Sequence, residues 1–429
     1  MPVLWRRLLA LAVVAVTVAL VVLGLRALLG ADEPSPVLAP ASGQAPGSGA
    51  AEVDPLAWSE DRSADFARAA ARGLAHPLYE HSPGGVVATA RRVARYRPLI
   101  DTVARQAGLD GDTIEGIVFL ESAGRPDVAA DPELEGAVGL TQILAETGRN
   151  LLGMRVDPAA ARRLGRSIRR NEARGRDAVV QRLRARRRAI DQRFDPVASL
   201  RATARYLGIA KRELGRDDLA VVSYHMGIGN LQAVLRDYGR ERVPYVQLFF
   251  DVTPLHHPAA YARLSSYGDD SSTYLWRVRA AQDIMRLWRA DRAALERLEE
   301  RHAAQDWGEE VLHPPGSKAD GDLADPPRDR LAEAGVTADG SMRLRPDALA
   351  LLEYVGTGAR AISGAAPLVA AGTGYTFEIR RDYVSGGQAR AFQFLLDRLV
   401  ALNLIAWVRE PDAIRVTVAS GAADGLRVG

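Results

Sequence analysis

The first thirty residues constrain the chain most, because they contain an uncharged apolar run that cannot remain in water. After MPVLWRR the sequence continues with LLALAVVAVTVALVVLGL, eighteen residues in which Thr17 carries the only hydroxyl group. At about 1.5 Å of rise per residue, a helix of this run and its neighbours crosses a hydrocarbon core roughly 30 Å thick. We therefore predict an N-terminal transmembrane signal anchor over residues 1–30.

Two arginines before this run predict its orientation. Arg6 and Arg7 favour a cytoplasmic amino terminus, so that everything after residue 30 lies outside the cytoplasm. The alternative is a cleaved signal peptide, but the run is long for one and no A-x-A site follows LRALLG. Both interpretations export the body of the protein. The anchor predicts a single-pass cell-membrane protein that faces the periplasm or the extracellular space.

The composition excludes several kinds of site and partner. The 429 residues include no cysteine, so neither a disulfide framework nor a thiolate metal site is available. The formal net charge of +3 is too small to indicate nucleic acid, and the exported location argues against it as well.

Composition also divides the chain beyond the anchor. Residues 31–57 are rich in Ala, Pro, Gly and Ser, which predicts a disordered linker. Residues 58–312 consist of long Ala/Leu/Arg segments typical of helices, and residues 313–329 form a second linker. In residues 330–429, YTFEIRRDYV and AWVREPDAIRVTVAS alternate as strands do, on either side of a predicted helix. The predicted fold class is a mainly α domain, preceded by one transmembrane helix and followed by a small α+β domain.

Arginines crowd the chain over residues 155–193, as in RRLGRSIRRNEARGR and RLRARRRAIDQR. One interpretation is a solvated helical insertion in the helical domain. The other is an electrostatic surface for anionic wall polymers or membrane phosphates.

The stretch GIVFLES places a glutamate on a helix face that the periodicity predicts to be buried. Ile114, Ile117 and Val118 recur at helical spacing, and Glu121 continues the same stripe. It also lies near the predicted end of the helix, where the macrodipole disfavours negative charge. Burial raises the pKa of a carboxylic acid, as a general acid near neutral pH requires. The alternative is a surface glutamate in a helix whose register differs from the predicted one.

Two further stretches follow in order: GAVGLTQILAETG, and some eighty residues later LAVVSYHMGIGNLQAVL. Together with ESAGRPDVAA they resemble the three signature motifs of the lytic transglycosylase catalytic domain, which shares the lysozyme-like fold of goose-type lysozyme. The motifs here read Glu121-Ser122, then Gly139-Leu140-Thr141-Gln142, then Ser223-Tyr224-His225-Met226-Gly227 with Gly229-Asn230 beyond. The resemblance covers roughly residues 90–290.

The resemblance implies roles for six residues. Glu121 is expected to act as the general acid and then the base, while Ser122 and Gln142 hold the sugar. Tyr224 is expected to steady Glu121 or the substrate, and Asn230 to shape a loop or bind an N-acetyl group. His225 stands where the family has asparagine, which puts its binding role in doubt, and Thr141 replaces a methionine.

The number of acids bears on the reaction. Ordinary glycosidases use two carboxyl groups, whereas lytic transglycosylases use one because the 6-hydroxyl of the substrate attacks and closes a 1,6-anhydro ring. The nearest candidates for a second catalytic acid are Asp131, Glu133 and Glu135 in DPELEGAVGL. We therefore expect a transglycosylase acting on peptidoglycan glycan strands without a cofactor. The alternatives are a lysozyme-type hydrolase of the same bond and a non-catalytic wall-binding scaffold.

The stretch ISGAAPLVAAGTGYTFEIRRDYVSGGQARAFQFLLDRL resembles the zinc D,D-carboxypeptidase family. Aligned on Gly374, the zinc-ligand positions fall on Ala371 and Glu378, with Arg415 on the late strand. Because both expected histidines are absent, we predict a degenerate domain that holds no metal and binds wall peptide or a partner. His256 and His257 are adjacent and are expected to point in different directions, as ordinary loop residues.

Overall fold

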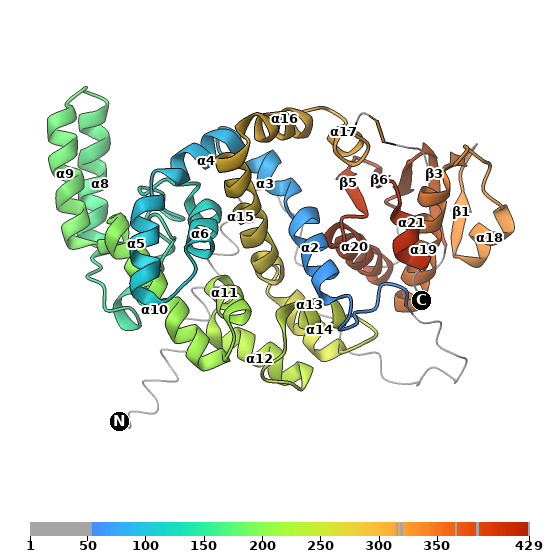
Figure 1. Ribbon diagram of the computed structural model, residues 1–429, viewed down its shortest axis with the longest axis horizontal. Coiled ribbons are helices and arrows are strands. Elements are labelled where there is room, and N and C mark those ends of the chain that lie inside the picture. The colour runs from blue at the N-terminus through green and yellow to red at the C-terminus, as the bar shows by residue number, and fades with distance from the viewer. Residues whose placement is uncertain are drawn as a thin grey trace. The chain divides into compact units, whose positions relative to one another are not determined.

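The computed structural model describes residues 54–314, 316–317, 321–340, 342–364, 367–382 and 386–427. These residues form a mostly helical part followed by a small mixed sheet with its own helices (Figure 1). This confirms the predicted order of a mainly helical part and a small part that contains both helices and strands. The predicted anchor over residues 1–30 lies outside the described residues. Within the described ranges, no helix combines the length and the apolar character that crossing a membrane requires.

Within residues 54–314, the helical part consists of helices of 6 to 19 residues and two short 3-10 turns. The helices up to the glutamate stretch are α2 (Ser63–Gly73), α3 (His76–His81), α4 (Val86–Ala94), α5 (Arg97–Ala107) and α6 (Gly111–Ser122). The middle elements are α7 (Ala145–Asn150), α8 (Pro158–Glu172), α9 (Asp177–Ile190), η1 (Gln192–Phe194), α10 (Pro196–Leu214), α11 (Asp217–Met226) and α12 (Ile228–Tyr238). The last are α13 (Tyr245–Asp251), α14 (Pro258–Ser266), η2 (Ser271–Thr273), α15 (Tyr274–Ala290), α16 (Arg292–His302) and α17 (Trp307–Leu312).

Aspartates and glycines set many of these helix bounds. The side chains of Asp110, Asp195 and Asp291 accept hydrogen bonds from backbone N–H groups in the first turns of α6, α10 and α16. Gly108 and Gly215 end α5 and α10 in the left-handed conformation. The Gly and Asp clusters between helical segments therefore act as caps.

Helix α6 packs along α15, which joins two segments about 160 residues apart in the chain. A methyl group at Gly116 would lie 2.8 Å from the carbonyl oxygen of Val278, so only glycine permits this close approach. Ile114, Ile117 and Val118 have no exposed surface. The predicted buried stripe of α6 is confirmed.

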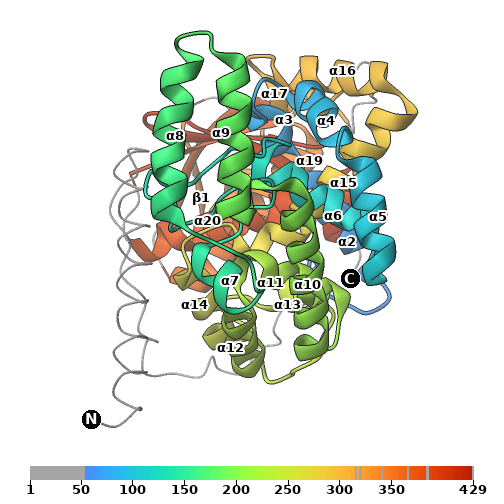
Figure 2. The same ribbon diagram turned by 90° about the vertical axis from the view of Figure 1, so that its left-hand side faces the viewer.

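The arginine-rich segment folds as a helical hairpin, with α8 and α9 side by side (Figures 1 and 2). Most of its arginines are exposed, but Arg187 is buried against the ring of Phe194 and pairs with Asp127. Arg193 is completely buried. The predicted solvated or electrostatic surface over residues 155–193 therefore excludes these two arginines, which serve packing.

Arg193, which follows α9 at the base of the hairpin, connects the hairpin by hydrogen bonds to the loop before α7. Its guanidinium donates to the carbonyl oxygens of Leu134 (2.7 Å) and Gly136 (2.9 Å), and to Oδ2 of Asp191 (2.8 Å). Gly139 has a φ of +84°, and a Cβ there would lie 1.9 Å from the carbonyl oxygen of Arg193. The hairpin base and the turn over residues 139–142 therefore form one packed unit.

The C-terminal sheet has the strand order β1-β3-β4-β6-β5, with β2 also paired to β3. Strands β1 and β2 run parallel to β3, while the β3–β4, β4–β6 and β5–β6 pairs are antiparallel. Helices α19 and α20 pack on each other and on the sheet. The elements are α18 (Arg328–Glu333), β1 (Val336–Ala338), β2 (Arg343–Leu344), α19 (Pro346–Ser363), β3 (Leu368–Gly374), β4 (Thr376–Arg380), α20 (Gly386–Ala401), β5 (Ile405–Arg409), β6 (Ala413–Val418) and α21 (Ala422–Arg427).

The sequence predicted the later strands of this sheet but not the earlier ones. Strands β4, β5 and β6 and helix α20 confirm the alternating stretches and the helix between them. Strand β3, LVAAGTG, was missed because alanine and glycine give it little β propensity. Its pairing with β1, β2 and β4 keeps it extended, which is a tertiary effect.

Both ends of the predicted helical domain differ in the structure. Leu56 falls within the predicted linker but is only 1% exposed, and Oδ2 of Asp54 lies 2.7 Å from Nη1 of Arg398. Helix α17, assigned from sequence to the helical domain, packs on β5 and β6. The contacts that order residues 54–57 come from a side chain far away in the chain, which local composition does not reveal.

Candidate functional site

Glu121 lies in the last turn of α6, on the stripe that its apolar neighbours bury. The helix ends one residue later, where Ala123 adopts the left-handed conformation (φ 53°) that non-glycine residues rarely adopt. Glu121 is half-buried. The structure therefore holds a carboxylic acid at the C-terminal end of a helix that is buried along its apolar stripe.

A second glutamate on the same helix, Glu115, is a buried acid whose charge is compensated by arginines, as expected of a structural residue. Glu115 has no exposed surface, and its Oε2 accepts from Arg97 at 2.9 Å and from Arg289 at 2.6 Å. Two cations thus compensate one buried carboxylate. Glu121 accepts no hydrogen bond from an arginine or a lysine in the described part of the chain.

The group that reaches Glu121 is the hydroxyl of Tyr274, the first residue of α15. It donates to Oε1 of Glu121 at 2.6 Å. Burial raises the pKa of Glu121 above its ordinary value of 4.5, while the Tyr274 hydrogen bond and the charges of His225 and Arg277 oppose the rise. Burial, together with the charge of Glu121, also raises the pKa of Tyr274, so this hydroxyl stays protonated and remains a donor.

His225 lies against this pair. Its ring stacks on Tyr274 with centroids 5.2 Å apart, its Nδ1 lies 2.9 Å from Oγ of Ser271, and its Nε2 lies 3.5 Å from Oδ1 of Asp270. Asp270 also pairs with Arg277. The predicted site residue His225 thus belongs to the Glu121 environment, held there by the segment that leads into α15.

Hydrogen bonds also join the other two predicted motifs. Ser122 is buried, and its hydroxyl donates to the carbonyl oxygen of Leu140 at 2.7 Å. Tyr224 donates to the carbonyl oxygen of Thr141 at 2.7 Å, and its ring stacks near Tyr274 with centroids 6.4 Å apart. The three motifs are therefore neighbours, but the hydroxyls of Ser122 and Tyr224 are used within the protein. Their binding roles stay predictions.

Gln142 and Asn230 hold backbone turns. Gln142 has a φ of +50°, and its Nε2 donates to the carbonyl oxygen of Gly139 at 2.8 Å. Nδ2 of Asn230 donates to the carbonyl oxygen of Met226 at 2.9 Å, between α11 and α12. This agrees with the loop-shaping role considered for Asn230, and sugar binding by either residue stays a prediction.

Sequence reasoning missed Tyr274, Asp270 and Arg277. They lie in YGDDSSTYLWRVR, some 150 residues after Glu121, and none belongs to the three quoted motifs. The available signal was a cluster of Asp and Ser before an amphipathic helix that starts with a tyrosine. Nothing in that signal shows that the helix packs along α6.

The three candidates for a second catalytic acid have partners elsewhere. Glu133 pairs with Arg162, Glu135 pairs with Arg149, and Oδ2 of Asp131 accepts from the backbone N–H of Gly136. Asp270 is instead the carboxylate that the structure ties to the Glu121 environment, through His225. It is itself neutralised by Arg277.

The positions aligned with zinc ligands come together in the C-terminal sheet. Ala371 pairs with Glu378 across β3 and β4, and Glu378 pairs with Arg415 across β4 and β6. Nε of Arg415 lies 3.5 Å from Oε1 of Glu378, so an ion pair occupies these positions. A cavity of about 580 Å³ lies beside them, lined by aromatic and charged side chains that include Trp307, Tyr375, Trp407 and Arg415.

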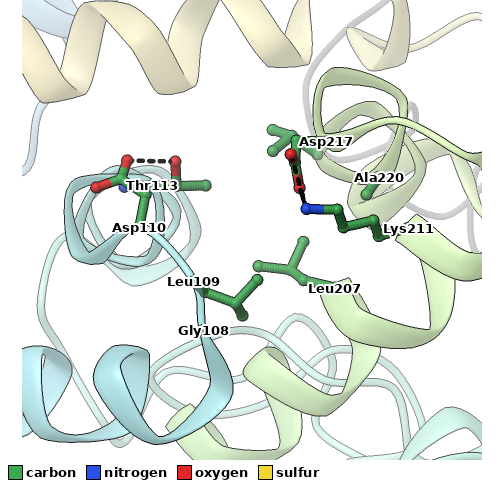
Figure 3. Close-up of a pocket in the computed structure, with 9 residues that line it drawn as sticks. Gly108, Leu109, Asp110, Thr113, Leu207, Lys211, Asp217 and Ala220 are labelled. Atoms are coloured by element: carbon green, nitrogen blue, oxygen red, sulfur yellow. Dashed lines mark hydrogen bonds and ion pairs between the residues drawn. The ribbon is translucent and has the colours of Figure 1, made fainter.

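Figure 3 shows another cavity, of about 220 Å³, between the start of α6 and helices α10 and α11. Lys211 pairs with Asp217 at 2.8 Å on one wall, and Asp110 and Thr113 bond each other on the facing wall. None of the six predicted site residues lines it. Its polar groups already have partners, and it supports no catalytic role.

No protein-family model matches the chain, and a search of curated proteins finds no match.

Proposed function

We propose that the protein is a membrane-anchored peptidoglycan lytic transglycosylase whose catalytic domain faces out of the cytoplasm. It cleaves the β-1,4 bond between N-acetylmuramic acid and N-acetylglucosamine in glycan strands. One observation carries the proposal: Glu121 is a half-buried acid to which no arginine or lysine of the described residues donates a hydrogen bond, and a tyrosine that stays protonated donates to its carboxyl group. A carboxyl group whose pKa lies above its ordinary value keeps its proton to a higher pH, as a general acid requires.

The proposed reaction uses Glu121 twice. Protonated Glu121 gives its proton to the glycosidic oxygen as the bond to C1 of the muramyl sugar breaks, releasing the N-acetylglucosamine end. The resulting carboxylate then takes the proton of the muramyl 6-hydroxyl, whose oxygen bonds to C1 and closes the 1,6-anhydro ring. No water is consumed, and the acid is regenerated.

The two alternatives differ in what they require. Hydrolysis needs a second group to activate water, and Asp270 is the acid near the site, although its pairing with Arg277 disfavours that role. A wall-binding scaffold needs no partly buried carboxyl group with a raised pKa. The arrangement of Glu121 and Tyr274 favours the enzyme.

The mass of the released sugar distinguishes the three hypotheses. Purified sacculi are incubated with the full-length protein in detergent and with the Glu121→Gln variant. Transglycosylation releases 1,6-anhydro-muropeptides from the wild type alone. Reducing-end muropeptides, heavier by one water, indicate a hydrolase, and no product from either protein indicates a scaffold.

Tyr274 and Tyr224 provide a matched pair for the role of the hydroxyl group. Tyr274→Phe removes the donor to Glu121, so we expect the pKa of Glu121 to rise further and the alkaline limb of the pH–rate profile to move upward. The loss of one charge-assisted hydrogen bond should slow cleavage by about tenfold. Tyr224→Phe removes a bond to a backbone carbonyl and should cost about 1 kcal/mol of stability without moving the profile. Equal shifts in both variants would contradict the assignment.

The exposed arginines of the hairpin support a second part of the proposal, contact with a phosphate-bearing anionic wall polymer. Arg166 and Arg169 on α8 are exposed and form no ion pair in the described part of the chain. Each arginine near an anionic surface contributes about 1 kcal/mol at low salt. The C-terminal domain is proposed to bind wall peptide or a partner, with no metal at the Ala371, Glu378 and Arg415 positions.

Charge reversal tests the hairpin. Arg166→Glu with Arg169→Glu should reduce co-sedimentation with phosphate-rich wall material at least about tenfold in low salt. The same reversal at two other exposed arginines, Arg105 on α5 and Arg240 after the end of α12, serves as control and should have a smaller effect. Equal losses in both double variants would show that only net charge matters. If the hairpin variant lost binding to anionic vesicles but kept its binding to wall material, the partner of the hairpin would be the membrane instead.

A further inference from the structure

Two histidines and an aspartate meet where α13 ends and α14 begins. Nδ1 of His256 lies 2.9 Å from Oδ1 of Asp251, and Nε2 of His257 lies 3.3 Å from Oδ2 of the same carboxylate. One ligand atom of each residue lies within 4.8 Å of the other two. Two imidazoles and a carboxylate form a donor set typical of divalent transition metals.

The backbone makes this meeting possible. The adjacent side chains of His256 and His257 were expected to point in different directions, as successive side chains do in an extended strand. His257 instead has φ 59° and ψ 50°, the left-handed conformation, in which a residue with a Cβ is uncommon and strained. The turn brings both rings, with centroids 4.6 Å apart, to one carboxylate. The expectation that the rings diverge is therefore wrong.

A second layer of contacts orients the carboxylate. The hydroxyl of Tyr238, at the end of α12, donates to Oδ2 of Asp251 at 2.6 Å, and Nε2 of Gln247 donates to that hydroxyl at 3.2 Å. The Tyr238 ring also lies against His257, with centroids 4.3 Å apart. Metal ligands are commonly held by such hydrogen bonds, which fix their orientation.

Charge around the cluster is compatible with a cation. Within the described residues, Asp251 has contacts with Tyr238, His256 and His257 and no ion pair with an arginine or a lysine. The carboxylate of Asp251 therefore carries a negative charge that no arginine or lysine pairs with in these ranges of the chain. A bare His–Asp–His hydrogen-bond cluster would account for the distances, but a cation would also balance this charge.

We propose that Asp251, His256 and His257 bind one divalent transition metal ion such as Zn²⁺. Each residue supplies one ligand atom, and a fourth position stays open to water. The site is separate from Glu121 and from the degenerate zinc positions of the C-terminal sheet, and it does not rest on the proposed activity.

A bound metal ion would connect α12 to the start of α14, and both helices also contact the third motif. Helix α12 begins at the third motif and ends at Tyr238, while α14 begins at the cluster and leads to Tyr267, whose hydroxyl donates to the carbonyl oxygen of Asn230 at 3.1 Å. A ligand that binds only the folded state raises the free energy of unfolding of the protein. The metal is therefore expected to stabilise the α12–α14 segment.

The test uses untagged full-length protein in detergent, treated with a chelator and titrated with ZnCl₂ in a calorimeter. We expect one equivalent to bind, and Co²⁺ to give the visible absorption of a low-symmetry site. His256→Gln and His257→Gln should each abolish measurable binding, and Tyr238→Phe should weaken it by roughly 10- to 100-fold. His81→Gln, which removes an exposed histidine on α3, should leave binding unchanged.

Three results would overturn the site. These are no saturable binding by the wild type, unchanged affinity in both cluster variants, or an equal loss in His81→Gln. His256 is exposed, so its substitution leaves the fold intact. If the variants have the far-ultraviolet spectrum of the wild type, they have kept the fold. If zinc then raises the unfolding temperature of the wild type but not of the variants, the variants have lost metal binding and not structure.

Discussion

Glu121→Gln is expected to abolish glycan cleavage while making the folded protein more stable at neutral pH. The amide cannot give or take the proton, so the rate should fall by about 10³-fold or more. Stability should rise because burial raises the pKa of Glu121 above its ordinary value of 4.5. An ionised carboxyl group at this position costs free energy, and the neutral amide removes that cost while it still accepts from Tyr274.

The sign of the pH dependence follows from the same shift. A folded-state pKa above the unfolded value means that the native state binds the proton more tightly. The stability of the wild type relative to the variant is therefore greatest below about pH 4.5 and is lost as the pH rises through the folded pKa. Thermal unfolding of both proteins across this range measures the difference.

Glu115 provides the matched control on the same helix. Glu115→Gln removes the charge that compensates Arg97 and Arg289, so it should lower the unfolding temperature at neutral pH. It should leave the chemistry of Glu121 in place. If Glu121→Gln destabilised the protein as Glu115→Gln does, the acid would be structural and the proposed function would lose its main support.

Arg193→Met is expected to have the largest effect on stability. It leaves Asp191 buried and unpaired and removes donors from the carbonyl oxygens of Leu134 and Gly136. Loss of one partner of a buried pair typically costs about 3–5 kcal/mol. Urea unfolding monitored by far-ultraviolet circular dichroism measures this, with Arg166→Met on the exposed face of α8 as control.

The consequence should reach the candidate site. The loop that Arg193 holds continues into the turn at Gly139 and Gln142, and Ser122 and Tyr224 bond that turn. Cleavage should therefore fall together with stability in Arg193→Met. A loss of less than about 1 kcal/mol, equal to that of the control, would show that the pair contributes little.

The sequence predicted features that depend on near neighbours in the chain. The spacing of Ile114, Ile117 and Val118 was enough to place Glu121 on a buried helix face, since helical geometry brings residues three and four apart together. Alternation predicted strands β4 to β6 in the same way. The class of the fold followed from these local patterns.

Contacts between distant segments were decided by the tertiary structure alone. Tyr274 reaches Glu121 from 153 residues away, and Arg398 pairs with Asp54 across 344 residues. Neither pairing leaves a periodic signal, because each depends on how whole helices pack. The turn at His257 likewise required a backbone conformation that its residue type disfavours.

The chain by itself therefore determined that residues 58–312 are mainly helical, where strands β4 to β6 lie, and which face of α6 is buried, because these depend on propensity and periodicity. The tertiary structure decided which hydroxyl holds the acid, which arginines are buried, and which histidines share a carboxylate. Those outcomes depend on the packing of segments far apart in the sequence, and side-chain chemistry acts only over a few ångströms.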